Sequence, residues 1–238
     1  NDAEEIRFAI CSCANFSSGY FHTYRYIALN EDLHAVLHLG DYIYESPSLG
    51  DEEGRQLQNP VEADDLEGYR GRYAEYRLDA DLQAMHRAHP MIAVWDDHEF
   101  DNNAYSSGSS NTTTEDWPRR SAEAKQAYHE WLPTEITSAD PLYRRFNFGG
   151  LVDLFMLDTR VEGRSQQLVR RDFNQRFDTE RKLLGDDQET WLHEGLSNSE
   201  ATWKLLGQQV MMSPLQVRGA LEEERDTAIL LNPDQWDG

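Results

Sequence analysis

The sequence predicts an α/β protein whose chemistry lies where its strands end. Three short apolar runs, each typical of a buried strand, occupy 6–11, 35–41 and 91–95. Helical patterns lie between them, and each run stops at polar or charged residues. In an open α/β sheet, ligands bind at the edge where the strands end. We therefore look for candidate functional residues at these ends.

The other elements follow from periodicity and from turn residues. The first half of the chain is expected to contain a helix at 23–34, an exposed loop at 46–65 and one amphipathic helix at 66–85. The second half is expected to contain a mobile low-complexity flap at 106–116, a helix at 121–131, a strand at 143–148, a strand from 151 to the charged pair Asp158 and Arg160, a helix at 200–212 and an irregular end at 232–238.

The stretch after the third strand carries the strongest chemical signal. Asp96, Asp97, His98 and Glu99 follow the apolar run directly. Carboxylates and an imidazole crowded at the end of a buried strand repel one another unless a cation lies among them. A metal site explains this pattern, and a solvated acidic loop is the alternative.

Composition excludes some function classes. With 22 Lys and Arg against 44 Asp and Glu, the formal charge of −22 argues against broad electrostatic binding to nucleic acid or to an anionic membrane. No apolar run reaches the ~18 residues that a membrane span needs. The first residues lack the basic and apolar regions of a signal peptide, so we expect that export is not used or that the signal has been removed.

The two cysteines, Cys11 and Cys13, are separated by one residue. This spacing makes a disulfide between them geometrically awkward, and a disulfide framework is excluded. Two interpretations stay open, a buried free thiol and a soft metal ligand.

Six residues at or just past separate strand ends form one candidate constellation: Cys13, Asp41, Tyr44, Asp97, His98 and Arg160. Hydrolysis of a phosphoester requires a polarising metal, an activated water, an acid for the leaving oxygen and a cation for the phosphoryl charge. The constellation supplies all four. A carboxylate such as Asp41 can bridge two metals, a phenolate such as Tyr44 suits a high-valent iron, and carboxylates suit calcium.

Six blocks in order resemble the PhoD-type alkaline phosphatases, a group within the calcineurin-like and purple acid phosphatase-related metallophosphatases. The blocks are Ser12-Cys13-x-Asn15, Gly40-Asp-Tyr-Ile-Tyr-Glu45, 95–103, Leu157-Asp-Thr-Arg160, a helical block at 203–212 and Asn232-Pro-Asp-Gln-Trp-Asp-Gly238. The resemblance runs from residue 6 to the end. It implies a four-layer αββα sandwich with two mixed β-sheets, and one metallophosphatase catalytic domain over 1–238.

The resemblance also implies roles for single residues. Cys13, Asp41 and Tyr44 would be ligands of Fe3+, with Asp41 bridging toward a second metal, Ca2+. Asp97 would be a ligand of that second metal, and His98 would contact the phosphate or protonate the leaving oxygen.

By the same resemblance Arg160 would clamp the phosphate as a catalytic residue. Asn15 and Asn103 are weaker candidates, for contact with the substrate or a metal. Pairing of Arg160 with Asp158 and a turn-forming role for Asn15 are the structural alternatives.

The family pattern includes a later Gly-Asp-x-His-type block that this sequence lacks. A fragment, a remainder on a separate chain and an inactive remnant would each explain this, and we expect a fragment.

The predicted function is metal-dependent hydrolysis of phosphomonoesters or phosphodiesters by a hydroxide held on the metal. The partner would be a small-molecule phosphoester, and by resemblance the location would be periplasmic or extracellular. The alternatives are an acidic calcium-binding protein, an inactive remnant, or an Asp-His hydrolase, although the last lacks Gly-x-Ser-x-Gly.

Overall fold

The computed structural model describes residues 4–47, 55–132, 134, 137–168, 170–213, 216–218, 228–230 and 234–236. Parts of the expected loop at 46–65 and of the expected irregular end at 232–238 lie outside these residues. No helix in the described part of the chain is both long and apolar enough to cross a membrane.

The first sheet is parallel and has the order β1-β2-β3. Its strands are β1 (Phe8–Cys11), β2 (Ala35–His38) and β3 (Met91–Ala93), as the apolar runs predicted. Cys11, His38 and Ala93 stand at matching positions across the sheet. Because the strands run in the same direction, the residues that follow them meet at one edge.

The second sheet is mixed and has the order β4-β5-β6. β4 (Arg144–Phe148) and β5 (Val152–Met156) are antiparallel and are joined through Gly149, which has a φ of +65°. β6 (Trp203–Gly207) pairs with β5 in parallel. A separate two-stranded sheet contains β7 (Gln216–Arg218) and β8 (Ala228–Leu230).

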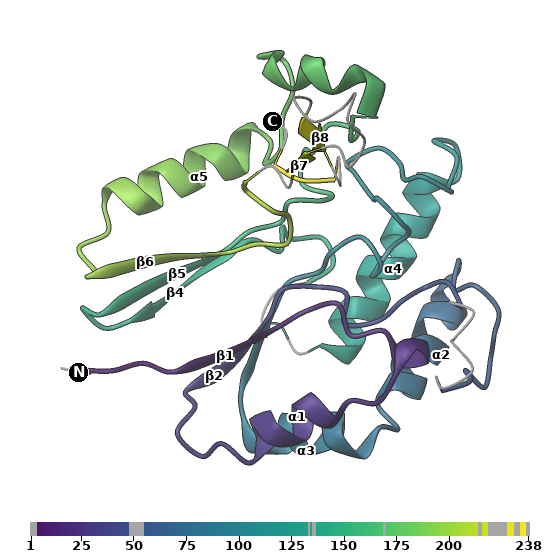
Figure 1. Cartoon of the computed structure of the whole chain (residues 1–238), viewed down its shortest axis with the longest axis vertical. Helices are drawn as coiled ribbons and strands as arrows, with labels where there is room; N and C mark the ends of the chain where they lie inside the picture. The colour runs from purple at the N-terminus through teal and green to yellow at the C-terminus, as the bar shows by residue number, and fades with distance from the viewer. Residues whose placement is uncertain are drawn as a thin grey trace.

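The two larger sheets pack face to face between helices, which confirms the predicted α/β fold (Figure 1). The rings of Phe8 in β1 and Phe148 in β4 meet edge to face, with 5.2 Å between their centroids. α1 (His22–Ala28) and α3 (Ala80–Ala88) cover the outer side of the first sheet, and α5 (Asp186–Ser197) covers the outer side of the second (Figure 1).

The helix predicted at 66–85 is in fact two helices, α2 (Leu66–Tyr76) and α3. Asp79 causes the break because its Oδ1 accepts hydrogen bonds from the backbone N–H groups of Asp81 and Leu82, which makes it the N-cap of α3. The predicted helix at 121–131 is confirmed and starts earlier, as α4 (Trp117–Trp131).

The helix predicted at 200–212 is wrong, because residues 203–207 form β6. Lys, Leu and Gln favour helix in isolation, but pairing with β5 outweighs this weak preference. α5, just before it in the chain, was not expected at all.

The segment expected to be a mobile flap, 106–116, is tied to the rest of the fold. The buried carboxylate of Asp101 accepts hydrogen bonds from the side chains of Ser109, Asn111 and Thr112. Three polar residues of this segment therefore serve as partners of one carboxylate.

Candidate metal centre

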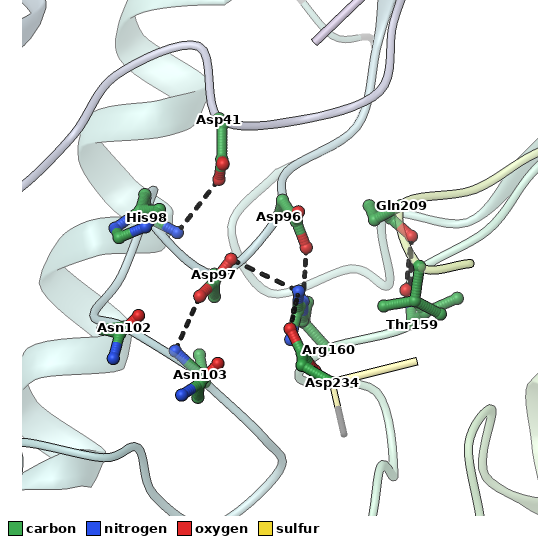
Figure 2. Close-up of polar contacts among 12 residues, drawn as sticks. Asp41, Asp96, Asp97, His98, Asn102, Asn103, Thr159, Arg160, Gln209 and Asp234 are labelled. Carbon is green, nitrogen blue, oxygen red and sulfur yellow. Dashed lines mark hydrogen bonds and ion pairs between the residues drawn. The ribbon is translucent and has the colours of Figure 1, made fainter. Parts of the chain in front are cut away.

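Three candidate ligands lie together at the end of the first sheet. Asp41 follows β2, Asp97 and His98 follow β3, and one ligand atom from each lies within 4.8 Å of the others (Figure 2). The two aspartates are buried, and the histidine is partly exposed. The parallel sheet brings these residues together because both strands end at the same edge.

A tight turn aims the Asp41 side chain. Gly40 has a φ of +99°, and a Cβ there would lie 2.4 Å from both Cβ and N of Asp96, so only glycine fits. Asp41 itself has a φ of +52°. The buried Glu99 accepts hydrogen bonds from the backbone N–H of Asp41 at 3.0 Å, of Asp96 at 2.7 Å and of Tyr42. One carboxylate therefore ties the exits of β2 and β3 together.

Tyr44 and Cys13 lie beside Asp41. The Tyr44 hydroxyl donates to Oδ2 of Asp41 at 2.9 Å, and its ring stacks on His98 with 4.2 Å between centroids. Cys13 has a φ of +56°, and its backbone N–H donates to the Gly40 carbonyl at 3.1 Å. Cys13 and Tyr44 line the same open cavity of about 810 Å3. Burial, and then the negative charges of Asp41 and Asp96, raise the pKa of the Cys13 thiol to about 11.

His98 is held by Glu45, a residue that no sequence pattern by itself singles out as functional. Nδ1 of His98 lies 2.7 Å from Oε2 of the fully buried Glu45. Burial lowers the pKa of His98, but the hydrogen bond and charge of Glu45 and the charge of Asp97 outweigh it and raise the pKa to about 10. The signal for Glu45 was its place at the end of the Gly40–Glu45 block.

The guanidinium of Arg160 is paired with carboxylates. Its Nε donates to Asp96, its Nη2 lies 3.3 Å from Oδ1 of Asp97, and Nη1 and Nη2 donate to Asp234 at 2.9 and 2.8 Å (Figure 2). Asp158 contributes differently, because its side chain accepts from the backbone N–H of Arg160 at 2.8 Å. The structure therefore places Arg160 next to Asp97, with its guanidinium already paired to carboxylates.

The two asparagines have different surroundings. Asn15 caps a 3-10 turn, Phe16–Ser18, by accepting from the backbone N–H of Ser17 at 2.9 Å, which agrees with the turn-forming alternative. Asn103 has a φ of +54°, and its backbone N–H donates to Oδ2 of Asp97 at 2.6 Å. Asn103 therefore contacts a candidate ligand through its backbone.

The charges of the cluster fit a metal ion. Burial, and then neighbouring carboxylates, raise the pKa of Asp41 to about 6. Burial and the charge of Asp41 raise the pKa of Glu99 to about 8. Burial also raises the pKa of Asp96, to about 7, although the charge of Arg160 opposes the shift. A cation among these groups would favour their charged forms. Carboxylate and imidazole, with phenol and thiol next to them, are ligands that proteins use for metals.

Comparison with known proteins gives one consistent result. The family model for PhoD-like phosphatases matches residues 8–238. Alkaline phosphatase D of Bacillus subtilis (strain 168) is 36% identical over 248 residues, which cover 98% of this chain and 41% of that protein. A solved structure of PhoD superposes with a TM-score of 0.83 at 35% identity, over 97% of this chain and 45% of the other. The chain thus spans less than half the length of the relatives it matches.

Proposed function

Because this chain belongs to the PhoD-like phosphatase family, we propose that it carries residues of a metal-dependent phosphoesterase site. The substrates would be small-molecule phosphomonoesters, phosphodiesters or both. One observation carries the proposal: carboxylate oxygens of Asp41 and Asp97 and an imidazole nitrogen of His98 lie within 4.8 Å of one another, where the strands of a parallel sheet end.

The donor types support two different metals. Cys13, Asp41 and Tyr44 would hold Fe3+, because thiolate and phenolate suit a high-valent iron better than an alkaline-earth ion. Asp97 would hold Ca2+, with Asp41 between the two positions. Bound metals would polarise the phosphoryl group and lower the pKa of the attacking water.

The proposed proton donor is His98. Glu45 accepts from Nδ1 at 2.7 Å, so Nε2 is the nitrogen left to face the leaving oxygen. The buried carboxylate keeps the imidazole charged and fixes its ring plane, and the ring of Tyr44 stacks against it. Arg160 would contribute positive charge on the far side of Asp97, and Asn15 and Asn103 remain candidates for substrate contact.

A non-catalytic calcium-binding protein explains less of this arrangement. Calcium prefers oxygen ligands. Calcium binding alone therefore does not explain a charged imidazole that is hydrogen-bonded to a buried glutamate. Membership of the PhoD-like phosphatase family does not favour an inactive remnant. A periplasmic or extracellular location is proposed on the family resemblance alone, and cell fractionation would test it.

Metal analysis of the full-length protein, combined with hydrolysis of a chromogenic phosphomonoester and phosphodiester at alkaline pH, tests the proposal. We expect iron and calcium in the purified protein and turnover that a chelator abolishes. Asp41→Asn should lower metal content and activity together, whereas Asp140→Asn, a change at an exposed turn, should alter neither. Full activity of Asp41→Asn with normal metal content would refute the assignment.

A further inference from the structure

A network of buried charges extends from the candidate metal centre to residue 234. Arg160 lies in its middle, with a side chain only 3% exposed. Its guanidinium has two edges that can make paired hydrogen bonds. The edge with Nε and Nη2 faces Asp96 and Asp97, and the edge with Nη1 and Nη2 donates to both carboxylate oxygens of Asp234 (Figure 2).

Asp234 is shared between two arginines. Nη2 of Arg164 lies 3.0 Å from Oδ1 of Asp234, and the Arg164 side chain is fully buried. Nη1 of Arg164 donates to the carbonyl of Thr159 at 3.2 Å, and Nη2 donates to that of Gln235 at 3.1 Å. Arg164 therefore fixes Asp234 against the same loop that carries Arg160.

The backbone beside Arg160 is bound to the exit of β3. The Thr159 hydroxyl donates to Oε1 of Gln209 at 2.6 Å (Figure 2). Nε2 of Gln209 donates to the carbonyls of Trp95 at 2.7 Å and Leu157 at 2.8 Å. Since Trp95 directly precedes the acidic stretch, the loop and the candidate ligands are fixed relative to each other. The direction of the Arg160 side chain is then set by the carboxylates on its two edges.

We propose that Asp234 and Arg164 are positioning residues of the metal centre. They hold Arg160 so that its Nη2 orients the carboxylate of Asp97, whose other oxygen is held by the backbone N–H of Asn103 at 2.6 Å. With both paired edges occupied, Arg160 acts on Asp97 and does not clamp the phosphate. This replaces the role that the family resemblance implied, and it rests on the proposed function insofar as Asp97 is a metal ligand.

Calcium affinity and substrate affinity, measured separately on the full-length protein, distinguish the two roles of Arg160. Asp234→Asn keeps the size of the side chain and removes the charge. We expect the Kd for Ca2+, from calorimetric titration, to rise about 10-fold, the lower end of the loss caused by removing a direct partner of a metal ligand, because Asp234 acts on Asp97 through Arg160. At saturating Ca2+, the KM for a chromogenic phosphodiester should stay within about twofold of wild type, because the phosphate never contacted Arg160.

Asp186→Asn is the matched control, since Asp186 forms an exposed ion pair with Lys182 at 3.0 Å and should leave both values unchanged. An unchanged Kd for Ca2+ would overturn the proposal, and a lowered KM would show that Asp234 blocks a phosphate-binding arginine.

If Asp234→Asn does not fold by circular dichroism, Asp234→Glu retains the charge in a longer side chain. That variant should also bind Ca2+ more weakly, and wild-type affinity would overturn the proposal. The Ca2+ titration does not require turnover. If the protein hydrolyses no phosphoester but Asp234→Asn still weakens Ca2+ binding, only the proposed function is refuted.

Discussion

The Glu45–His98 pair shows how one buried side chain sets the charge of another. Glu45 is fully buried, so its carboxylate needs partners within the protein. It has them, because Oε2 lies 2.7 Å from Nδ1 of His98 and Oε1 accepts from the backbone N–H of Asn102 at 3.0 Å. The pair gives His98 a fixed ring orientation and a proton at neutral pH.

Replacing Glu45 by glutamine should therefore change the titration of His98. The wild-type pKa is about 10 in the metal-free protein, so the stabilisation from this pair is fully present below about pH 6.5 and is lost as the pH rises toward 10. In Glu45→Gln the pKa should fall to its ordinary value or below, because burial then dominates. NMR titration of the His98 ring in chelated protein measures this directly, and kcat should fall about 10- to 100-fold.

Glu123→Gln is the control, since Glu123 pairs with Arg119 on the surface of α4. An unchanged pKa of His98 in Glu45→Gln would show that the imidazole is charged for another reason.

At the scale of elements, the candidate site depends on how closely the exits of β2 and β3 approach. Gly40 has no Cβ, and the backbone of Asp96 occupies the space where one would be. Glu99 then accepts backbone hydrogen bonds from both exits. The spacing between Asp41 and Asp97 is therefore set by backbone contacts.

Gly40→Ala should destabilise the protein and weaken metal binding at the same time. The new methyl group meets Asp96 at 2.4 Å, and the φ of +99° is unfavourable for alanine. We expect a loss of about 2–4 kcal/mol in the free energy of unfolding, measured in urea. Gly71→Ala, in α2 with open space around it, should instead stabilise by about 0.5–1 kcal/mol. Equal effects of the two variants would contradict the steric argument.

A second prediction concerns the 106–112 segment, which Asp101 anchors. Asp101→Ala removes a buried acceptor and leaves the donors of Ser109, Asn111 and Thr112 without it. We expect a loss of about 2–4 kcal/mol in unfolding free energy and faster hydrogen exchange confined to this segment. Asp140→Ala, at an exposed turn, provides the baseline for both measurements. Wild-type exchange rates in Asp101→Ala would mean that another contact holds the segment.

Sequence patterns predicted the strands of the first sheet because each is a continuous apolar run that ends in polar residues. These patterns failed where contacts with distant parts of the chain determine the structure. β6 was predicted to be a helix because its pairing with β5 is invisible in local composition. Glu45 and Asp234 were given no role because their partners are distant in the chain, 53 residues away for His98 and 74 for Arg160. The candidate ligands themselves were predictable, since each directly follows a strand or lies in a recognisable block.

At the scale of the whole molecule, the formal charge of −22 and the acidic cluster act in the same direction. Both make the metal-free protein less stable at alkaline pH than it would otherwise be. Asp41, Asp96 and Glu99 have raised pKa values of about 6, 7 and 8, so the folded state binds their protons more tightly than the unfolded state does. As the pH falls through these values, the folded state is favoured.

Chelated and calcium-loaded protein should therefore respond to pH in opposite ways. Between about pH 8.5 and pH 7, the Tm of chelated protein should rise as the pH falls, because the buried carboxylates take up protons. The Tm of calcium-loaded protein should fall over the same range, because protons compete with the metal. At pH 8.5, calcium at about 100 times its Kd should add about 2.7 kcal/mol, or about 5–10 °C in Tm.

Magnesium at the same ionic strength controls for general screening of the negative charge. If both forms gave parallel curves, calcium would not be bound close enough to Asp41, Asp96 and Glu99 to lower their pKa values.

Three residues of the candidate centre, Cys13, Asp41 and Asn103, are the described non-glycine residues with a positive φ. Glycine would suit all three backbones better, so sequence redesign guided by thermostability would favour it at these positions. Such a redesign would gain stability and delete the Cys13 thiol and the Asp41 carboxylate from the candidate centre, together with the Asn103 amide that donates to Ser110. A positive φ at a non-glycine residue here marks a position where a side chain is held at a cost in backbone stability, and libraries for engineering should leave those positions unchanged.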